Sequence, residues 1–192
     1  MKELKSMKSI IYISMSLLLF LGACKENSTT TGTSQKTVSV EKPSMDIHGA
    51  IISNNLEVVK QHIKAGSDLD VKEPMSGSTP LISAATFNRA DIAKALINAQ
   101  ADLEIKNNDG STALHTAAFF GRIEIVQLLI DAKADKTIKN NFGATPRETV
   151  LGDFAQVKPV YEMMITQLQP MGFKLNLEAL EKARPVISVM LQ

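Results

Sequence analysis

The chain has 192 residues, of which 44% are hydrophobic and 21% are charged, a composition typical of a globular protein and not of a disordered one. Its formal net charge is +1, and it falls to −1 without residues 1–23, which hold three lysines and one glutamate. Nucleic-acid binding relies on a basic excess, so we expect no nucleic-acid partner. The lack of tryptophan and the 5% content of aromatic residues argue against a carbohydrate-binding cleft.

The first 23 residues have the features of a secretion signal. Three lysines precede an apolar run at residues 10–21, and the small residues Gly22 and Ala23 follow it. The run is shorter than the roughly 20 apolar residues of a membrane span. We therefore expect a signal peptide, which starts at either Met1 or Met7, because the sequence from Met7 is a complete signal by itself.

The single cysteine, Cys24, follows this signal directly. The sequence Leu21-Gly22-Ala23-Cys24 resembles the lipobox of bacterial lipoproteins, in which the thiol is acylated and the cysteine becomes the new N-terminus. The resemblance implies a lipid anchor at Cys24 in the cell envelope. Lys25 stands where an aspartate favours inner-membrane retention in some bacteria, so the outer membrane, facing the periplasm, is favoured. The alternative is an ordinary cleaved signal or a signal anchor with an incidental cysteine.

Residues 24–43 join this anchor to the rest of the chain. From residue 25 to residue 43 the sequence holds eight serines and threonines and almost no large apolar side chains. Such a segment does not bury enough surface to fold. We interpret it as a flexible tether with a reach on the order of 25 Å.

From residue 77 onwards the sequence repeats every 33 residues. The glycine and threonine that open each copy recur, and so do a pair of alanines and several apolar residues after them. These positions are Gly77, Gly110 and Gly143; Thr79, Thr112 and Thr145; Ala84-Ala85 and Ala117-Ala118; Ile92 and Ile125; Leu96 and Leu129. A fixed period of this length predicts stacked units, none of which buries its apolar faces alone.

Each unit reads as a turn followed by two antiparallel helices. Gly110 suits a turn that a side chain would resist, and Thr112 is a suitable helix N-cap. Apolar residues at helical spacing then mark one buried face on either side of a break at Gly121. Later copies have Gln100 and Lys133 at the helix end where the first copy has Gly66, so we expect strained left-handed turns there.

The content of the period resembles the ankyrin repeat, whose signature is T-P-L-H-x-A-A. Here it stands at residues 79–85 and 112–118, with Ile82 in place of the histidine and Ala113 in place of the proline. The resemblance implies an all-α ankyrin-repeat solenoid over residues 44–168, with about four repeats. Their expected bounds are 46–72, 73–107, 108–140 and 141–168.

The outer copies depart from this pattern. In the first copy, His62 and Gln61 replace apolar residues, as expected if its outer face meets water. The fourth copy keeps its turn and then drifts into an amphipathic helix from about Val157, in which proline is tolerated only in the first turn. We expect residues 169–192 to form a C-terminal helical cap with two short helices, the second starting at Pro185. The alternative is a partner-binding amphipathic tail.

No catalytic or metal-binding motif is present. The three histidines are not three or four residues apart, and no phosphate loop, dinucleotide fingerprint or nucleophile elbow occurs. We expect no metal, no cofactor and no enzymatic activity, and a monomer as the oligomeric state.

The ankyrin resemblance implies contacts with a protein partner at the hairpin tips and the exposed side of the first helices. By motif position these contacts are Met75, Ser76, Ser78, Thr86 and Phe87; Asn108, Asp109, Ser111, Phe119 and Phe120; and Asn141, Phe142 and Ala144. Large apolar groups on a surface need a reason. The alternative for the phenylalanines is that one of each pair packs into the groove between repeats.

Two functions therefore stand beside each other. The first is a binding module, either an immunity-type protein that blocks a toxic enzyme or a periplasmic partner of a protective enzyme or envelope complex. The second is a structural envelope scaffold or spacer without a specific partner, which predicts a uniformly polar face along the first helices.

Overall fold

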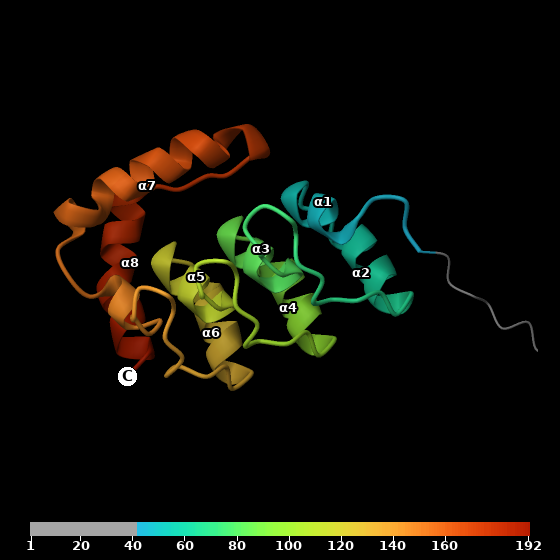
Figure 1. Ribbon diagram of the computed structural model, residues 1–192, viewed down its shortest axis with the longest axis horizontal. Helices are drawn as coiled ribbons and strands as arrows, with labels where there is room; N and C mark the ends of the chain where they lie inside the picture. The colour runs from blue at the N-terminus through green and yellow to red at the C-terminus, as the bar shows by residue number, and fades with distance from the viewer. Residues whose placement is uncertain (1–41) are drawn as a thin grey trace, which may run out of the picture. The chain divides into compact units, whose positions relative to one another are not determined.

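The computed structural model describes residues 42–192, so the predicted signal peptide, Cys24 and nearly all of the tether lie outside the described residues. The described part is all-helical and contains no strand. Figure 1 shows the order of its elements. The α-helices are α1 (Ile47–Ile52), α2 (Leu56–Lys64), α3 (Pro80–Thr86), α4 (Ala90–Asn98), α5 (Ala113–Phe119), α6 (Ile123–Asp131), α7 (Phe154–Leu168) and α8 (Leu177–Met190), and two 3-10 turns are η1 (Glu148–Val150) and η2 (Gln169–Met171).

Helices α1 to α6 form three antiparallel pairs, as the 33-residue period predicts. The Oγ1 atom of Thr79 accepts a hydrogen bond of 3.3 Å from the N–H of Ile82, which caps the start of α3. Thr112 is the N-cap of α5. Each first helix packs against the first helix of the next pair, α1 on α3 and α3 on α5, and each second helix does the same. The pairs therefore stack in register.

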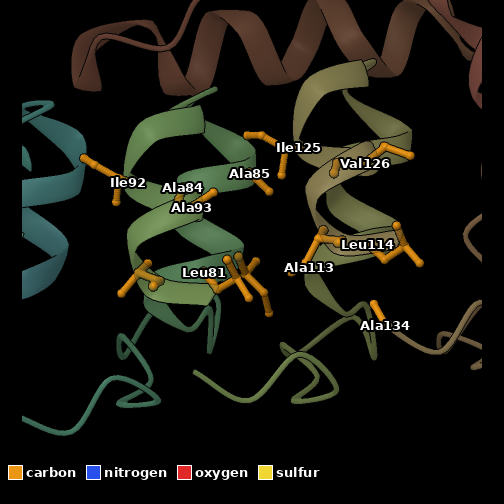
Figure 2. Close-up of a cluster of buried hydrophobic side chains, with 14 of the residues drawn as sticks. Leu81, Ala84, Ala85, Ile92, Ala93, Ala113, Leu114, Ile125, Val126 and Ala134 are labelled. Carbon is orange, nitrogen blue, oxygen red and sulfur yellow. The ribbon is translucent and has the colours of Figure 1, made fainter. Parts of the chain in front are cut away.

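The core lies between these stacked pairs. The first helices are buried on nearly all sides, and their paired alanines, Ala84-Ala85 and Ala117-Ala118, leave room for the neighbouring backbone. The second helices bury one face each, with Ile92 and Leu96 on α4. Figure 2 shows part of this core on two neighbouring pairs, with Ala84, Ala85 and Ile92 on one pair and Leu114 and Ile125 on the next. Burying a side chain of this size stabilises the fold by about 1.5–3 kcal/mol.

The first helix pair differs from expectation at His62. This side chain is buried, with 1% of its surface exposed, whereas the sequence predicts that it faces water. Its Nε2 atom lies 2.8 Å from the carbonyl oxygen of Met45, and its Nδ1 atom lies 3.0 Å from the Oγ atom of Ser67. The segment before α1 thus covers the end of α2. A polar side chain is needed at position 62 because it bonds to the backbone carbonyl of that segment.

The fourth copy departs furthest from the other three. Its turn forms, but the single 3-10 turn η1 stands against α5 where a first helix is expected. Helix α8 packs against both α6 and η1, so it takes the place of the second helix. Arg147, which replaces the apolar residue of the other copies, is partly buried and donates a hydrogen bond of 3.1 Å to the Ser188 carbonyl on α8. The fourth copy is therefore closed by α8, and α7 is inserted between its two parts.

The two C-terminal helices are longer than the sequence predicts. Helix α7 begins at Phe154, which places Pro159 beyond its first turn, and α8 runs through Pro185 without a break. Proline removes one hydrogen bond to the residue four positions earlier. Those residues are Ala155 and Glu181, both on the exposed side, so water can satisfy the freed carbonyl groups. Among the described residues, no helix has the length and apolar character needed to cross a membrane.

The left-handed turns at Gln100 and Lys133 are present as predicted. Their φ angles are 65° and 69°, close to the 66° of Gly66 at the equivalent turn of the first pair. A side chain resists this conformation by about 1–2 kcal/mol. The two later pairs therefore carry strain that the first pair avoids.

Replacing Lys133 with glycine should relieve this strain. We expect Lys133→Gly to raise the free energy of unfolding by roughly 0.5–1 kcal/mol, after the entropic cost of glycine is subtracted. The reciprocal change Gly66→Lys, at a turn with open space around it, should lower the free energy of unfolding by a similar amount. Urea denaturation of both variants measures this, and a loss of stability in Lys133→Gly would contradict the prediction.

Candidate protein-binding site

Three hairpin loops open the second, third and fourth copies, and we call them loop 2 (residues 73–78), loop 3 (107–111) and loop 4 (140–144). One side chain organises each loop from its first position. The Oδ1 atom of Asn107 accepts hydrogen bonds from two N–H groups of loop 3 at 2.9 and 3.0 Å, and Asn140 does the same in loop 4 at 3.0 and 3.1 Å. Loop 2 has one residue more, and Glu73 takes this role with its longer side chain.

The carboxylate of Glu73 is strongly held in its ionised form. Burial raises its pKa, but hydrogen bonds from the Ser76 side chain and from the N–H groups of Met75, Ser76 and Ser78 outweigh burial and lower the pKa from 4.5 to about 2. Because the folded pKa is depressed, this contribution to stability is complete above pH 4.5. It is lost as the pH falls towards about 2. Loop 2 therefore stays ordered at neutral pH.

The loops are joined to one another by a repeated set of three hydrogen bonds, which we call the loop ladder. Asn108 donates through its backbone N–H to the Ser76 carbonyl at 2.9 Å and through Nδ2 to the Met75 carbonyl at 3.1 Å. The third bond runs the other way, from Lys72 Nζ to the Lys106 carbonyl at 2.7 Å.

The same set recurs one loop further along. Asn141 donates to the carbonyls of Asp109 at 2.9 Å and Asn108 at 3.0 Å. Lys106 Nζ donates to the Lys139 carbonyl at 2.9 Å. The side chains of Asn108 and Asn141, which the sequence places at the partner surface, are therefore engaged with the neighbouring loop.

A pocket of about 410 Å³ lies beside loops 3 and 4, under α7. The predicted residues Asp109, Ser111, Phe119, Phe120, Phe142 and Ala144 line it, together with Asn107, His115, Thr116, Asn140 and Thr149. The opposite wall is formed by Val160 and Met164 of α7, which the sequence analysis did not select. The other predicted residues, Met75, Ser76, Ser78, Thr86, Phe87, Asn108 and Asn141, lie outside the pocket.

His115 ties the floor of this pocket to loop 4. Its Nε2 atom donates to the Ala144 carbonyl at 3.0 Å, and its Nδ1 atom accepts from the backbone N–H of Thr112 at 3.2 Å. This pattern requires the neutral ring. Burial is the largest influence and lowers the pKa of His115 below its ordinary value, in agreement with that state. The imidazole thus has a structural role within its turn.

The C-terminal segment covers the aromatic ends of the first helices. Phe120 is only 4% exposed and packs edge-on against Phe173 at 5.2 Å between ring centroids. Phe173 also lies 6.2 Å from Phe87. The chain's own C-terminal segment therefore covers most of the Phe120 ring, as the alternative of a packed phenylalanine predicts, and only its edge reaches the pocket.

Phe119 keeps a place at the edge of this aromatic cluster. Its ring lies 4.6 Å from that of Tyr161 on α7, and the Tyr161 hydroxyl donates a hydrogen bond of 2.9 Å to the Phe119 carbonyl. Figure 1 shows α7 (orange) running past the ends of α5 and α3, where these contacts occur. Phe119 is half-buried, with one side on Tyr161 and another towards the pocket. Phe87 is likewise half-buried.

Comparison with known protein families agrees with the architecture. A family model of ankyrin repeats, in three copies, matches residues 47–140. Residues 47–140 are ankyrin repeats. The match ends at the first residue of loop 4, ahead of the 3-10 turn that replaces the first helix of the fourth copy.

Individual proteins match parts of this chain. Protein phosphatase 1 regulatory subunit 27 of Homo sapiens, like that of Mus musculus, is 41% identical over 63 residues, which are 33% of this chain. The chain spans 40% of the length of these curated relatives. A solved structure, the ankyrin repeat domain of Bcl-3, described as a unique member of the IkappaB protein family, matches with a TM-score of 0.52 and 30% identity. That match covers 54% of this chain and 45% of the other.

Two arginines that recur at the ankyrin period were missed in the sequence. Arg89 and Arg122 are 33 residues apart, and each begins a second helix. Arg89 donates to the carbonyls of Ile51 and Ile52 at 3.3 and 2.9 Å, and Arg122 donates to the Thr86 carbonyl at 3.2 Å. Each arginine thus holds the end of the preceding repeat's first helix. Their equal spacing was the signal that would have found them.

Arg122 has a second function that Arg89 lacks. It donates a further bond of 3.2 Å to the Lys174 carbonyl. Its guanidinium also lies 5.8 Å from the Phe120 ring centroid and 5.6 Å from that of Phe173. Burial, followed by the charge of Arg89, lowers the pKa of Arg122 to about 10, so it stays charged at neutral pH. Arg122 therefore fastens the C-terminal segment to the repeats.

Glycines in the loops allow a test of the loop ladder. A Cβ added at Gly110 would lie 2.7 Å from the backbone nitrogen of Asn141, whereas nothing lies within 4 Å of one added at Gly143. Both glycines have left-handed φ angles, 72° and 76°. We expect Gly143→Ala to cost about 1 kcal/mol of unfolding free energy, from backbone strain alone. Gly110→Ala should cost at least about 1 kcal/mol more, because loop 4 must move. Equal losses in thermal denaturation would show that the loops do not support each other.

Proposed function

We propose that this chain is a lipid-anchored protein of the bacterial cell envelope that binds a protein partner through its hairpin loops and the pocket beside them. Ankyrin repeats typically mediate protein–protein interaction, which supports the binding role. Within residues 42–192, no three metal-ligating side chains converge on one point. The pocket has hydrogen-bonded polar groups and apolar walls, which suit recognition of a side chain.

The observation that carries this proposal is the exposed aromatic ring at the mouth of the pocket. Phe142 is 78% exposed at the tip of loop 4, although the backbone on either side of it is fixed by hydrogen bonds. A rigid, exposed phenylalanine beside an apolar pocket needs a reason. The pocket volume, about 410 Å³, lies within the range of roughly 300–1,000 Å³ found for ligand sites. A partner that inserts an apolar side chain into the pocket would cover both the pocket and the Phe142 ring.

The relatives support a regulatory kind of binding. The curated relatives bear the name of a regulatory subunit of a phosphatase, which is a protein that acts by binding an enzyme. For this chain we propose an enzyme or an envelope complex as the partner. An immunity-type role, in which a toxic enzyme is blocked, and a protective role, in which an enzyme is assisted, both fit such a site.

The anchor part of the proposal depends on Cys24. Its lipobox sequence follows a basic start and an apolar run, and the Ser/Thr-rich segment behind it separates the anchor from the repeats. A multiply acylated cysteine supplies the more than one lipid chain that stable anchoring requires. The repeats would then face the periplasm from the outer membrane.

A structural scaffold without a specific partner is the second candidate. It is favoured by the position of α7, which buries much of the aromatic surface that a partner would otherwise contact. The exposed ring of Phe142 opposes it, since a spacer gains nothing from an apolar tip.

The binding role is tested by substitution at this tip. Capture from envelope extract with the full chain, followed by mass spectrometry, identifies the partner, and titration calorimetry then gives the affinity. We expect Phe142→Ala to weaken binding by about 2 kcal/mol, roughly 30-fold, without a change in thermal stability, because aromatic residues often dominate interface energy. Val189→Ala is the control, since Val189 is 65% exposed on α8, outside the pocket.

The same experiment separates the surface from the core. Phe120→Ala should lower the free energy of unfolding by about 3–5 kcal/mol, because its ring is buried. A scaffold would give no reproducible partner. Equal affinity of the wild-type chain and Phe142→Ala for a captured partner would place the binding surface elsewhere.

Anchoring gives a separate prediction. Cys24→Ser removes the thiol that acylation requires, so the protein should leave the detergent phase and the membrane fraction. Detergent-phase partitioning and metabolic labelling with a fatty acid measure both effects. Unchanged partitioning of Cys24→Ser would refute the lipid anchor and leave the proposed binding role intact.

A further inference from the structure

The loop ladder ends at loop 4 with its bonding groups in place. On loops 2 and 3, two consecutive carbonyls accept from one asparagine of the next loop, and a lysine donates back to a carbonyl two residues before that asparagine. On loop 4 the corresponding groups are the carbonyls of Asn141 and Phe142 and the Nζ atom of Lys139. Within residues 42–192, no hydrogen bond is made by any of these three groups.

The space beside loop 4 is also open. At Gly77 and Gly110, an added Cβ atom would overlap the Oδ1 atom of the next loop's asparagine, which shows that this side chain lies directly beside the glycine. The equivalent place beside Gly143 holds no described atom within 4 Å. Lys139, Asn141 and Phe142 are all exposed. We call this edge of loop 4 the seat: it consists of the carbonyls of Asn141 and Phe142, the Nζ atom of Lys139 and the open space beside Gly143, and its bonding groups match one asparagine.

We propose that this edge of loop 4 docks a turn of a partner protein that presents an asparagine. The backbone N–H and Nδ2 of that asparagine donate to the carbonyls of Phe142 and Asn141, and a carbonyl two residues before it accepts from Lys139. The inference rests on the proposed protein-binding function and adds the chemistry of the bound segment. The chain itself makes this three-bond set twice, which is the argument for its third use.

The hairpin loops of a second copy of this chain do not fit the seat. In loop 2, the free outer loop of a second copy, Met75 replaces the asparagine, so the side-chain donor is missing. The N–H group of Met75 is already bonded to Glu73 at 2.8 Å. The asparagines of loops 3 and 4 are engaged in the copy's own ladder. The hairpin loops of a second copy therefore lack a free asparagine for this position.

The probe for this docking is a backbone-cyclised peptide of residues 105–112, which carries Asn108 in the turn that the ladder uses. Fluorescence anisotropy of the labelled peptide, titrated with the full chain in detergent micelles, gives the dissociation constant. We expect saturable binding in the millimolar range, with the amide signals of Phe142 and Gly143 shifted in the nitrogen-15 NMR spectrum. The peptide with Asn108→Ala should bind at least tenfold more weakly.

Two glycine variants of the full chain provide the decisive comparison. Gly143→Ala places a Cβ atom in the seat and should weaken peptide binding at least tenfold. Gly66→Ala imposes the same left-handed strain, at φ 66° and with open space around it, but lies in the first repeat. It should leave peptide binding unchanged.

The proposal is overturned by any of three results: no saturable binding of the peptide, equal binding by Gly143→Ala and the wild-type chain, or an equal loss in Gly66→Ala. Failure here is distinct from failure of the proposed function. A captured partner whose affinity depends on Phe142 but not on Gly143 would retain the binding role and remove the seat.

Discussion

The stacking of one helix pair on the next is the interaction on which the rest of this protein depends. Ala84-Ala85 and Ala117-Ala118 let the first helices approach closely, and the isoleucines and leucines of the second helices fill the space behind them. Arg89 and Arg122 reach across the same boundary to the preceding repeat. Because each boundary needs a partner on both sides, the series must be closed at its ends. Helix α8 closes one end, and the segment around Met45 covers the other.

The closure at α8 also explains the C-terminal segment. Once α8 takes the place of a second helix, the residues between η1 and α8 have no position inside the stack. They leave it, form α7, and return through Phe173 to the aromatic ends of α3 and α5. Two buried side chains fix α7 to the repeats. The Arg184 Nη1 atom donates to the Tyr161 hydroxyl at 3.2 Å, and this hydroxyl donates to the Phe119 carbonyl at the end of α5. The pocket lies between this excursion, through Val160 and Met164, and loops 3 and 4.

The repeat period made much of this fold predictable from the sequence. Each position in one copy was tested by its equivalents, which is how the left-handed turns at Gln100 and Lys133 were found from Gly66 alone. Prediction was poor where the period lapses. Val160 and Met164 face loop 4 across a long separation in sequence, and no local pattern reports such a contact. The hairpin residues were placed at the loop tips, but the sequence did not show that Asn108 and Asn141 bond to neighbouring loops.

The bond between His62 and the Met45 carbonyl has a mechanical consequence. Any force that reaches the repeats along the chain from the N-terminal side arrives first at the segment before α1. There, the His62 imidazole bonds to the Met45 carbonyl, and the hydroxyl of Ser67, just after α2, bonds to the other nitrogen of the ring. A pull on this segment is therefore shared with the last turn of α2 before it reaches α1. With leucine at position 62, as at the equivalent positions of the later copies, the same pull would be opposed only by apolar contacts, which have no directional bond to the backbone.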